Sequence, residues 1–180
     1  DVESWDVSIV GVPFDAGTSY RSGARFGPQA IRAGSRLLRS HHPALGVAPF
    51  HDQQVVDAGD LAVSPYNIDD AIVQIEAGAN ELLESAPRIV SLGGDHTIAL
   101  PMLRAMKKVH GPVGMVHVDA HTDINDDMFG EKIAHGTPFR RAVEEGLLDC
   151  DRVVQIGVRG TGYAADDFDW SREQGFRCAG

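Results

Sequence analysis

Apolar segments of strand length alternate with helical patterns along almost the whole chain. The strand-length segments are bounded by glycine, proline or polar residues, and we predict buried strands there. They span residues 7–12, 54–57, 88–90, 115–118 and 152–158, and another begins near residue 175. Apolar residues at helical spacing predict helices over 67–85, 98–109 and 138–147, and we also expect a helix at 28–38, after Pro28, and a polar helical stretch at 164–173. This alternation predicts an α/β fold, in which helices cover both faces of a parallel sheet.

Individual residues mark where some helices begin. Pro28 and Pro138 suit the first turn of a helix, where a backbone N–H is not needed. Asn67 or Asp69 caps the helix that follows it. The glycine-rich segment 15–27 could cradle a phosphate, but it matches neither a P-loop nor a dinucleotide fingerprint. We interpret this segment as a structural loop or as the rim of a substrate site.

Composition narrows the class of protein. The chain has 180 residues, of which 43% are hydrophobic and 23% charged, so we expect one globular domain over residues 1–180. The formal net charge of -10 argues against nucleic acid or an anionic membrane as partner. Cys150 and Cys178 have no ligand-like or redox spacing, which favours a cytoplasmic location. No apolar run reaches the length of a membrane span.

Both ends of the chain look cut. It opens without methionine and almost at once enters a predicted strand, and a new strand starts just before Gly180. We therefore expect the sequence to be the N-terminal part of a longer domain, truncated at its C-terminal side.

Three polar residues follow the predicted strand at 115–118. Asp119, His121 and Asp123 recur at every second position, so an extended chain would place their side chains on the same side. Two carboxylates and an imidazole are costly to gather at a strand end unless a cation lies among them. The alternative is a polar loop that merely caps the strand.

A second cluster follows the predicted strand at 88–90. It comprises Gly93, Gly94, Asp95 and His96. Ligands of open parallel sheets bind beyond the carboxyl ends of the strands, so adjacent strands could bring His96 to the first cluster. Imidazole and carboxylate without thiolate favour manganese or a similar divalent metal over structural zinc. The number of carboxylates favours two metals that share one bridging carboxylate. Asp95 could orient a ligand from the second shell or cap the following helix.

Other polar residues carry weaker indications. His135 lies in a loop, where solvated surface is the usual role, although its titration range suits proton transfer near a hydrolytic centre. His117 lies two residues before Asp119, so its side chain could face the same site. It lies inside a strand, however, and we favour core packing or a second-shell role. Asp126 and Asp127 are expected on the solvated face of their loop.

The two clusters, together with His135-Gly136, resemble the signature blocks of the ureohydrolases, the arginase and agmatinase family. The segment 23–32 resembles the N-terminal block of the agmatinase branch, as do Phe139-Arg140-Arg141 and 155–160. The resemblance covers nearly the whole chain. It implies a three-layer α/β arginase-like fold, two Mn2+ ions, a small guanidino substrate and a homo-oligomer, either a trimer or a hexamer.

The resemblance also implies roles for individual residues. His96 and Asp123 would bind the first metal, His121 the second, and Asp119 would bridge them. A metal-activated hydroxide would attack the guanidinium carbon, releasing urea and an amine. Asp123 would carry a proton to the leaving nitrogen, and His135 would shuttle protons or contact the substrate. The family's last metal block, S-x-D-x-D-x-x-D-P, is absent and is expected beyond Gly180.

The loop from Asn125 to Ala134 lies where the family reads the far end of its substrate. It lacks the Asn/Ser-rich pattern with which arginases hold an α-amino acid, and Met128 and Phe129 suggest an apolar wall. The loop resembles agmatinases and guanidinobutyrases, so agmatine and 4-guanidinobutanoate both stay open as substrates, with a slight preference for agmatine on charge. Two alternatives also stay open. They are a non-catalytic subunit of the same fold and another metallohydrolase on a related fold, such as a deacetylase.

Overall fold

The computed structural model describes residues 5–162 and 167–179. The chain divides into two compact units, and each is described here by itself. The first unit comprises residues 1–16 and 21–95, and the second comprises residues 17–20 and 96–180. The expectation that residues 1–180 form one domain stays a prediction.

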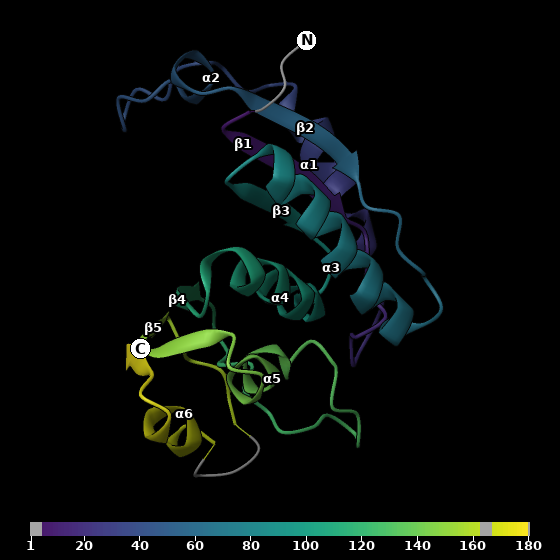
Figure 1. The fold of residues 1–180 in the computed structure, drawn as a ribbon, viewed down its shortest axis with the longest axis vertical. Coiled ribbons are helices and arrows are strands. Elements are labelled where there is room, and N and C mark those ends of the chain that lie inside the picture. The colour runs from purple at the N-terminus through teal and green to yellow at the C-terminus, as the bar shows by residue number, and fades with distance from the viewer. Residues whose placement is uncertain (1–4, 163–166, 180) are drawn as a thin grey trace. The chain divides into compact units, whose positions relative to one another are not determined.

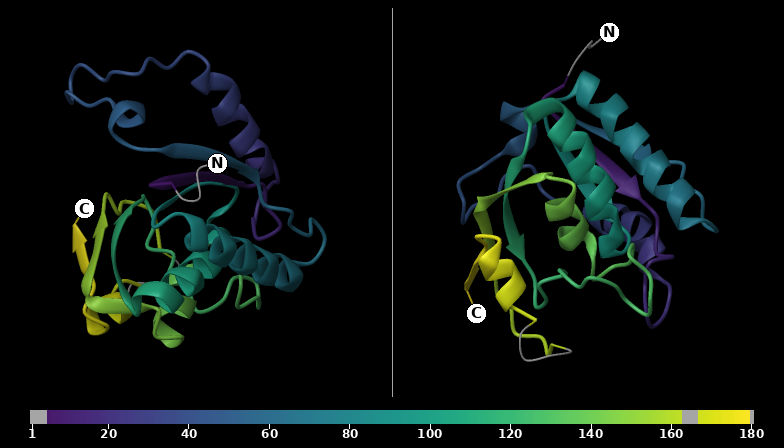
Figure 2. Two further views of the ribbon diagram at one scale, coloured as in Figure 1. Left: turned by 45° about the horizontal axis from the view of Figure 1, so that its top comes forward. Right: turned by 60° about the horizontal axis from the view of Figure 1, so that its bottom comes forward.

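The first unit contains a parallel three-stranded sheet. Its strands β1 (Val7–Val12), β2 (Val55–Asp60) and β3 (Ile89–Gly93) lie in the order β2-β1-β3. Both strand pairs are parallel. Figures 1 and 2 show the helices α1 (Gly27–Ser35) and α3 (Ile68–Ser85) on opposite faces of this sheet. Two short helices complete the unit, η1 (Ala24–Phe26) and α2 (Pro49–Asp52).

Helix boundaries in this unit follow local chemistry. The Asn67 side chain caps α3 by accepting hydrogen bonds from the backbone N–H groups of Asp69 (2.9 Å) and Asp70 (3.3 Å). The buried positions of α3 recur at helical spacing and are Ala71, Ile72, Ile75 and Ala79. Pro28 lies in the first turn of α1, as predicted, but the helix ends at Ser35 rather than near Leu38. The predicted strand at 54–57 extends to Asp60.

The second unit contains another parallel three-stranded sheet. Its strands β4 (Val113–Val118), β5 (Leu148–Ile156) and β6 (Arg177–Ala179) lie in the order β4-β5-β6. Its helices are η2 (His96–Ile98), α4 (Ala99–His110), α5 (Pro138–Glu144) and α6 (Asp169–Glu173). The core joins α4, α5 and β5 through Leu100, Phe139, Ala142 and Val153, with further buried residues at Ile124, Leu147, Leu148 and Phe176. Part of the predicted helix at 164–173 lies outside the described residues.

One face of β4 differs from the prediction. The sequence predicted a fully buried strand, yet the side chains of Val116 and Val118 are 70% and 74% exposed. Strand residues alternate between faces, and the core of this unit lies on the side of Val113, Met115 and His117. Apolar composition alone therefore did not distinguish one buried face from two.

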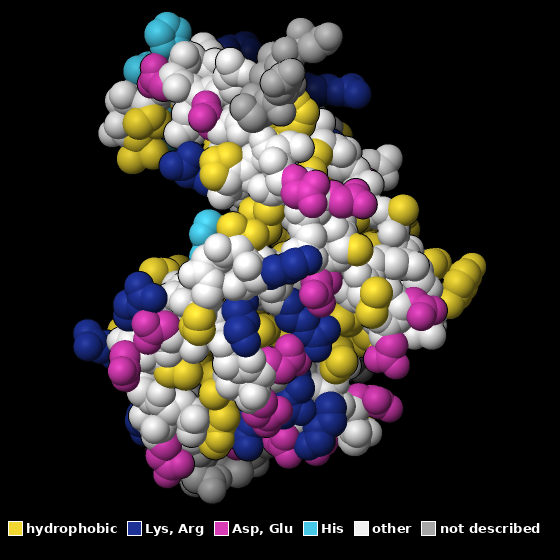
Figure 3. All heavy atoms as spheres, in the orientation of Figure 1, with side chains coloured by type: hydrophobic (Ala, Val, Ile, Leu, Met, Phe, Trp, Pro, Cys, Tyr) yellow, Lys and Arg dark blue, Asp and Glu magenta, His cyan; other side chains and the backbone are white. Residues whose placement is uncertain are grey.

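The exposed surface of the second unit mixes charges of both signs. Figure 3 shows acidic and basic side chains interspersed there. Many of them are paired, including Arg104 with Glu145 (2.8 Å) and Arg152 with Asp149 (2.6 Å). Among the described residues, no helix combines the length and apolar character needed to cross a membrane.

Candidate metal centre

The end of β4 delivers the first residues of the site. The ladder to β5 continues one residue beyond the strand, because Asp119 N–H donates to the Ile156 carbonyl (3.1 Å). The chain then bends, and Asp123 adopts a φ of 51°, which is uncommon for a residue other than glycine. Short polar side chains tolerate this left-handed conformation best. Because the strand has ended, alternation no longer determines which way side chains point after Asp119.

Four side chains converge in the second unit. One donor atom from each of His96, His117, Asp119 and Asp123 lies within 4.8 Å of the other three. His96 Nδ1 contacts Asp123 Oδ2 directly and lies 4.0 Å from Asp119 Oδ2. His117 Nε2 lies 3.7 Å from that same Asp119 oxygen. The structure thus brings together three predicted ligands and adds His117.

An aromatic side chain packs against both imidazoles. The Phe139 ring centroid, from the start of α5, lies 5.2 Å from that of His96 and 4.6 Å from that of His117, both in edge-on geometry. Phe139 is only 3% exposed and belongs to the core. This packing restricts the rotation of both rings and keeps water away from one side of the group.

His121 lies outside this group. Its imidazole is 64% exposed, with Nδ1 3.3 Å from Asp119 Oδ1. Its backbone N–H donates to the same oxygen at 2.8 Å. Gly160 packs closely against it, since a Cβ at Gly160 would lie 2.6 Å from His121 Cδ2. The prediction that His121 binds a second metal stays a prediction.

The surroundings shift two pKa values in the group. Burial, together with the nearby His96, lowers the pKa of His117. Burial alone would raise the pKa of Asp119, but the backbone hydrogen bond from His121 and the neighbouring imidazoles outweigh it and leave the pKa lowered. These shifts favour a neutral His117 imidazole beside an ionised Asp119 carboxylate, and the carboxylate can donate an electron pair to a cation.

His135 is held by a segment more than 100 residues earlier in the chain. Its backbone N–H donates to the Gly17 carbonyl (3.0 Å), and its Nε2 lies 3.0 Å from Ser19 Oγ. Residues 17–20 belong to the second unit, as His135 does. A serine hydroxyl can donate or accept, so this bond can persist whether or not Nε2 carries a proton.

The predicted substrate loop has a defined conformation. Asn125 binds the Gly136 carbonyl through both its backbone N–H (3.0 Å) and its side-chain amide (2.9 Å). Met128 is buried, whereas Phe129 is 87% exposed at the tip of a turn. Positive φ at both Phe129 (55°) and Gly130 (88°) fits a type I′ turn. Reciprocal backbone hydrogen bonds between Met128 and Glu131 close this turn.

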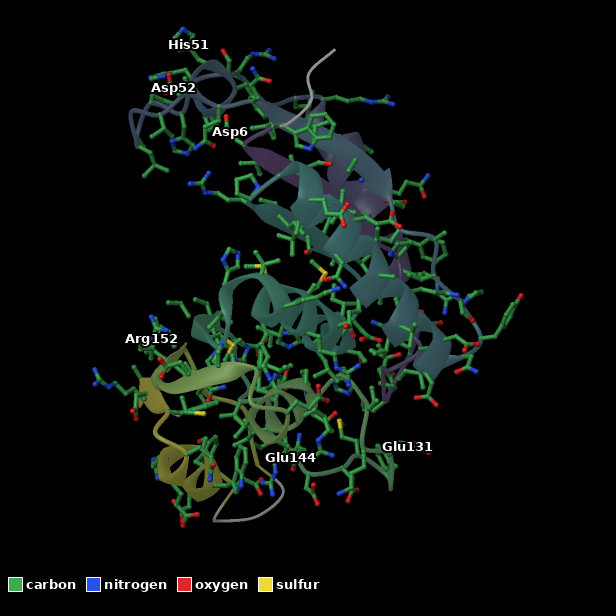
Figure 4. The ribbon with its side chains drawn as sticks, in the orientation of Figure 1. Asp6, His51, Asp52, Glu131, Glu144 and Arg152 are labelled. Carbon is green, nitrogen blue, oxygen red and sulfur yellow. The ribbon has the colours of Figure 1, made fainter. Side chains whose placement is uncertain are left out.

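The acidic residues of this loop are largely engaged. Asp126 pairs with Lys132 (2.7 Å) and with Arg141 (2.8 Å), and these hydrogen bonds lower the pKa of Asp126 to about 2. Asp127 accepts a hydrogen bond from the backbone N–H of Gly130 (3.1 Å). Glu131 is exposed (Figure 4). The loop therefore presents less free negative charge than its sequence suggests.

Asp95 belongs to the first unit and is buried there. Its backbone N–H donates to the Phe14 carbonyl (2.8 Å). The preceding Gly94 has a φ of 61°, and a Cβ there would lie 2.5 Å from the Val12 carbonyl oxygen. Glycine is thus required at position 94. A second-shell role for Asp95 stays a prediction.

Two residues that contact His117 or His135 were not given a role in the sequence analysis. Gln155 is fully buried, pairs in register with His117 across the β4–β5 ladder, and contacts its Nδ1 at 3.0 Å. Ser19 meets His135 from a distant segment, which no local pattern could predict. The sequence did contain a signal for His117. It lies two residues before Asp119, so an extended chain places both side chains on the same side.

The residues fit a divalent metal. The imidazole of His96 and the carboxylates of Asp119 and Asp123 are nitrogen and oxygen donors typical of transition-metal sites, and no thiolate belongs to the group. Nε2 of His117 is buried without a hydrogen-bond partner among the described residues, although it faces the carboxylates. A cluster of this kind is costly unless a cation or further donors complete it.

The fold and this group define a member of the arginase family. The Arginase family model matches residues 5–179, and the chain belongs to that family. The predicted arginase-like α/β fold is confirmed by solved structures. One is proclavaminate amidino hydrolase from Streptomyces clavuligerus, with a TM-score of 0.92 and 40% sequence identity over 99% of this chain and 60% of that one.

Curated relatives agree with the predicted branch. The chain is 59% identical to the guanidinobutyrase of Pseudomonas aeruginosa over 177 residues, which are 98% of this chain and 56% of that protein. It is 53% identical to the mitochondrial agmatinase of Gallus gallus over 175 residues, which are 97% of this chain and 52% of that protein. The chain thus spans about half the length of these relatives.

Proposed function

We propose that the complete protein is a manganese-dependent amidinohydrolase that releases urea and an amine from a linear guanidino compound. The observation that carries this proposal is the convergence of His96, His117, Asp119 and Asp123 within 4.8 Å. Membership in the arginase family supports the same reaction class.

The ligands proposed for two manganese ions are His96, Asp119, His121 and Asp123. Asp119 would bridge the metals, because one of its oxygens faces His96 and His117 while the other faces His121. When bound, two such cations would activate water for attack on the guanidinium carbon. Two further aspartates, expected beyond Gly180, would complete the ligand set.

Two side chains are proposed to handle protons. Asp123 is 9% exposed and touches His96, so it is positioned within the ligand group to carry a proton to the leaving nitrogen. His135 is proposed to exchange protons or contact the substrate. Its Nε2 is engaged by Ser19, which leaves Nδ1 as the nitrogen open to exchange.

The substrate proposed first is 4-guanidinobutanoate, with agmatine second. Simple charge counting in the loop favoured the cationic agmatine, but Asp126 is neutralised by Lys132 and Arg141. The greater identity to a guanidinobutyrase than to an agmatinase points the same way. The far end of the substrate, opposite the guanidino group, is proposed to contact Asn125, Met128 and Phe129.

Urea release tests this function. The protein expressed from its complete gene and loaded with Mn2+ should release urea from 4-guanidinobutanoate, from agmatine or from both. A protein that binds metal but releases urea from neither would contradict the proposal and favour a non-catalytic subunit. Acetylated amines serve as the control substrates, because their hydrolysis would instead indicate a deacetylase.

We also propose a cytoplasmic homo-oligomer, a trimer or a hexamer, on the basis of family resemblance. The two cysteines, Cys150 and Cys178, are free, as expected in a reducing compartment. Light scattering on the purified complete protein should give a mass three or six times that of one chain.

A further inference from the structure

The orientation of the Gln155 side-chain amide is fixed by its neighbours. Its Nε2 lies 2.7 Å from the Thr122 carbonyl oxygen, which can only accept a hydrogen bond. Exchanging the amide nitrogen and oxygen would bring two acceptors to 2.7 Å from each other. On the other side, the Cys178 thiol lies 3.5 Å from Gln155 Oε1 and can donate to it. The NH2 group of Gln155 therefore faces Thr122 and His117.

This orientation determines which ring nitrogen of His117 carries the proton. Gln155 Nε2 lies 3.0 Å from His117 Nδ1 and can only donate, so Nδ1 must accept and has no proton of its own. A neutral imidazole then carries its proton on Nε2. A protonated ring would place an Nδ1–H against the NH2 group of Gln155.

His117 Nε2–H faces the ligand group. The side chain is 7% exposed, and Nε2 is buried without a hydrogen-bond partner among the described residues. Asp119 Oδ2 lies 3.7 Å from Nε2, which is longer than a hydrogen bond. Asp119 is 31% exposed, so its carboxylate has room for the small rotation that would close this distance.

We infer that His117 is a positioning residue, which donates its Nε2–H to Asp119, and that Gln155 fixes the tautomer needed for this. His117 is thus not a metal ligand, although its ring lies among the ligands, because the nitrogen that faces them has no free lone pair. The inference rests on the proposed function in one respect, the metal-binding role of Asp119. A hydrogen bond to one carboxylate oxygen orients the other lone pairs toward a cation.

The tautomer can be measured directly in the metal-free complete protein. Nitrogen NMR of ring-labelled histidine, assigned by the signals that disappear in His117→Asn, should show a proton on Nε2 and none on Nδ1 of His117. The opposite tautomer would overturn the inference. The wild-type protein is used, and neither metal nor activity is required, so the result is independent of the reaction the enzyme performs.

Manganese affinity separates a donor from a ligand. His117→Phe keeps an aromatic ring but removes the N–H, and it should weaken Mn2+ binding about 10- to 100-fold, as loss of an outer-shell partner does. His117→Gln keeps an N–H donor and should bind within about threefold of wild type. His96→Gln, which removes a proposed ligand, should cost more than His117→Phe. The surface variant His110→Phe is the matched control and should change nothing.

Two results would overturn the assignment. If His117→Gln weakened binding as much as His96→Gln, His117 would be a ligand. If His117→Phe bound Mn2+ as well as wild type, the hydrogen bond would have no role. Thermal unfolding of each variant verifies folding, and a variant that fails to fold leaves the NMR tautomer as the deciding result. Because affinity is the readout, absence of urea release would count against the proposed function alone.

Discussion

Two groups of carboxylates, one in each unit, have opposite kinds of charge partner. In the first unit the carboxylate of Asp15 is buried and accepts hydrogen bonds from Arg25 Nε (2.5 Å), Gly23 N–H (2.6 Å) and Arg25 N–H (3.1 Å). On β2 of the same unit, Asp57 and Asp60 both pair with Arg32. A guanidinium within the chain thus balances each of these carboxylates.

In the second unit, the carboxylates of the ligand group have imidazoles as charge partners. Asp123 contacts His96, and Asp119 is near His96, His117 and His121. Imidazoles are weak bases, and burial lowers the pKa of His117 further. The difference teaches that a carboxylate paired with arginine already has its counter-charge within the chain, whereas carboxylates gathered among imidazoles form a group that a cation would stabilise. Four predictions can break or sharpen this comparison.

The largest expected effect is on metal binding. Asp119→Ala should lose more metal than any other single change among His96, Asp119, His121 and Asp123, because a bridging carboxylate serves both cations and reduces their repulsion. Metal content of the complete protein, measured for the four alanine variants, provides the comparison. Asp126→Ala is the control, since Asp126 pairs with Lys132 and Arg141. Two metals retained by Asp119→Ala, with both lost from His121→Ala, would show that the roles are assigned wrongly.

The next effect is on stability, in the first unit. Asp15→Ala should destabilise the protein by about 1–3 kcal/mol, because it removes the buried acceptor of the Gly23 and Arg25 backbone N–H groups and the partner of the Arg25 guanidinium. Denaturant unfolding gives this free energy. Asp52→Ala, at an exposed carboxylate, is the matched control and should remain within about 0.5 kcal/mol of wild type. Equal stability of the two variants would contradict a structural role for Asp15.

A pH effect follows from the same carboxylate. Burial alone would raise the pKa of Asp15, but hydrogen bonds from Arg25 and Gly23 outweigh it and leave the pKa below its ordinary value of 3.8. The unfolded chain therefore binds a proton first, so this contribution to stability is present above about pH 4 and is lost as the pH falls through the folded-state pKa. Melting temperatures between pH 3 and pH 7 should fall less steeply on the acid side in Asp15→Asn than in wild type. Parallel curves would refute the contribution.

The smallest expected effect is on specificity. Met128→Gln should change the ratio of kcat/KM for 4-guanidinobutanoate and agmatine by about fivefold, or about 1 kcal/mol, if the loop contributes an apolar wall. The companion variant Phe129→Ala changes an exposed side chain of the same loop. Comparing the two variants shows whether the buried Met128 or the exposed Phe129 affects specificity. A ratio that stays within about twofold in both variants would remove the loop from the account of specificity.

The fold could be predicted from the sequence because periodicity and local signals agree. Asn67 caps α3, Pro28 and Pro138 open α1 and α5, and the strands follow in the expected order. Boundaries were less accurate, since β5 begins at Leu148 rather than Arg152. The pattern also did not show that the side chains of Val116 and Val118 are exposed, because apolar residues occur on both faces of β4 and do not indicate which face is buried.

The candidate site was predicted in part. His96, Asp119 and Asp123 do converge, although β3, which precedes His96, and β4, which precedes Asp119, belong to different sheets. The period-two argument did not place His121 in that group, because β4 ends at Val118 and the chain bends after it. Gln155 and Ser19 act across strands or between distant segments. Such contacts depend on the strand register and on the path of the chain, and no local sequence pattern indicates either of them.

Metal content tests the central claim most directly. The complete protein, purified in Mn2+ and then desalted, should retain two manganese ions per chain by elemental analysis, because carboxylates gathered among imidazoles without an arginine or lysine partner among the described residues are costly unless a cation joins them. The Asp15→Ala variant should retain the same metal content if it folds, since the carboxylate that it removes pairs with Arg25 and is not part of the ligand group. A wild-type protein that retained no divalent metal would contradict the account.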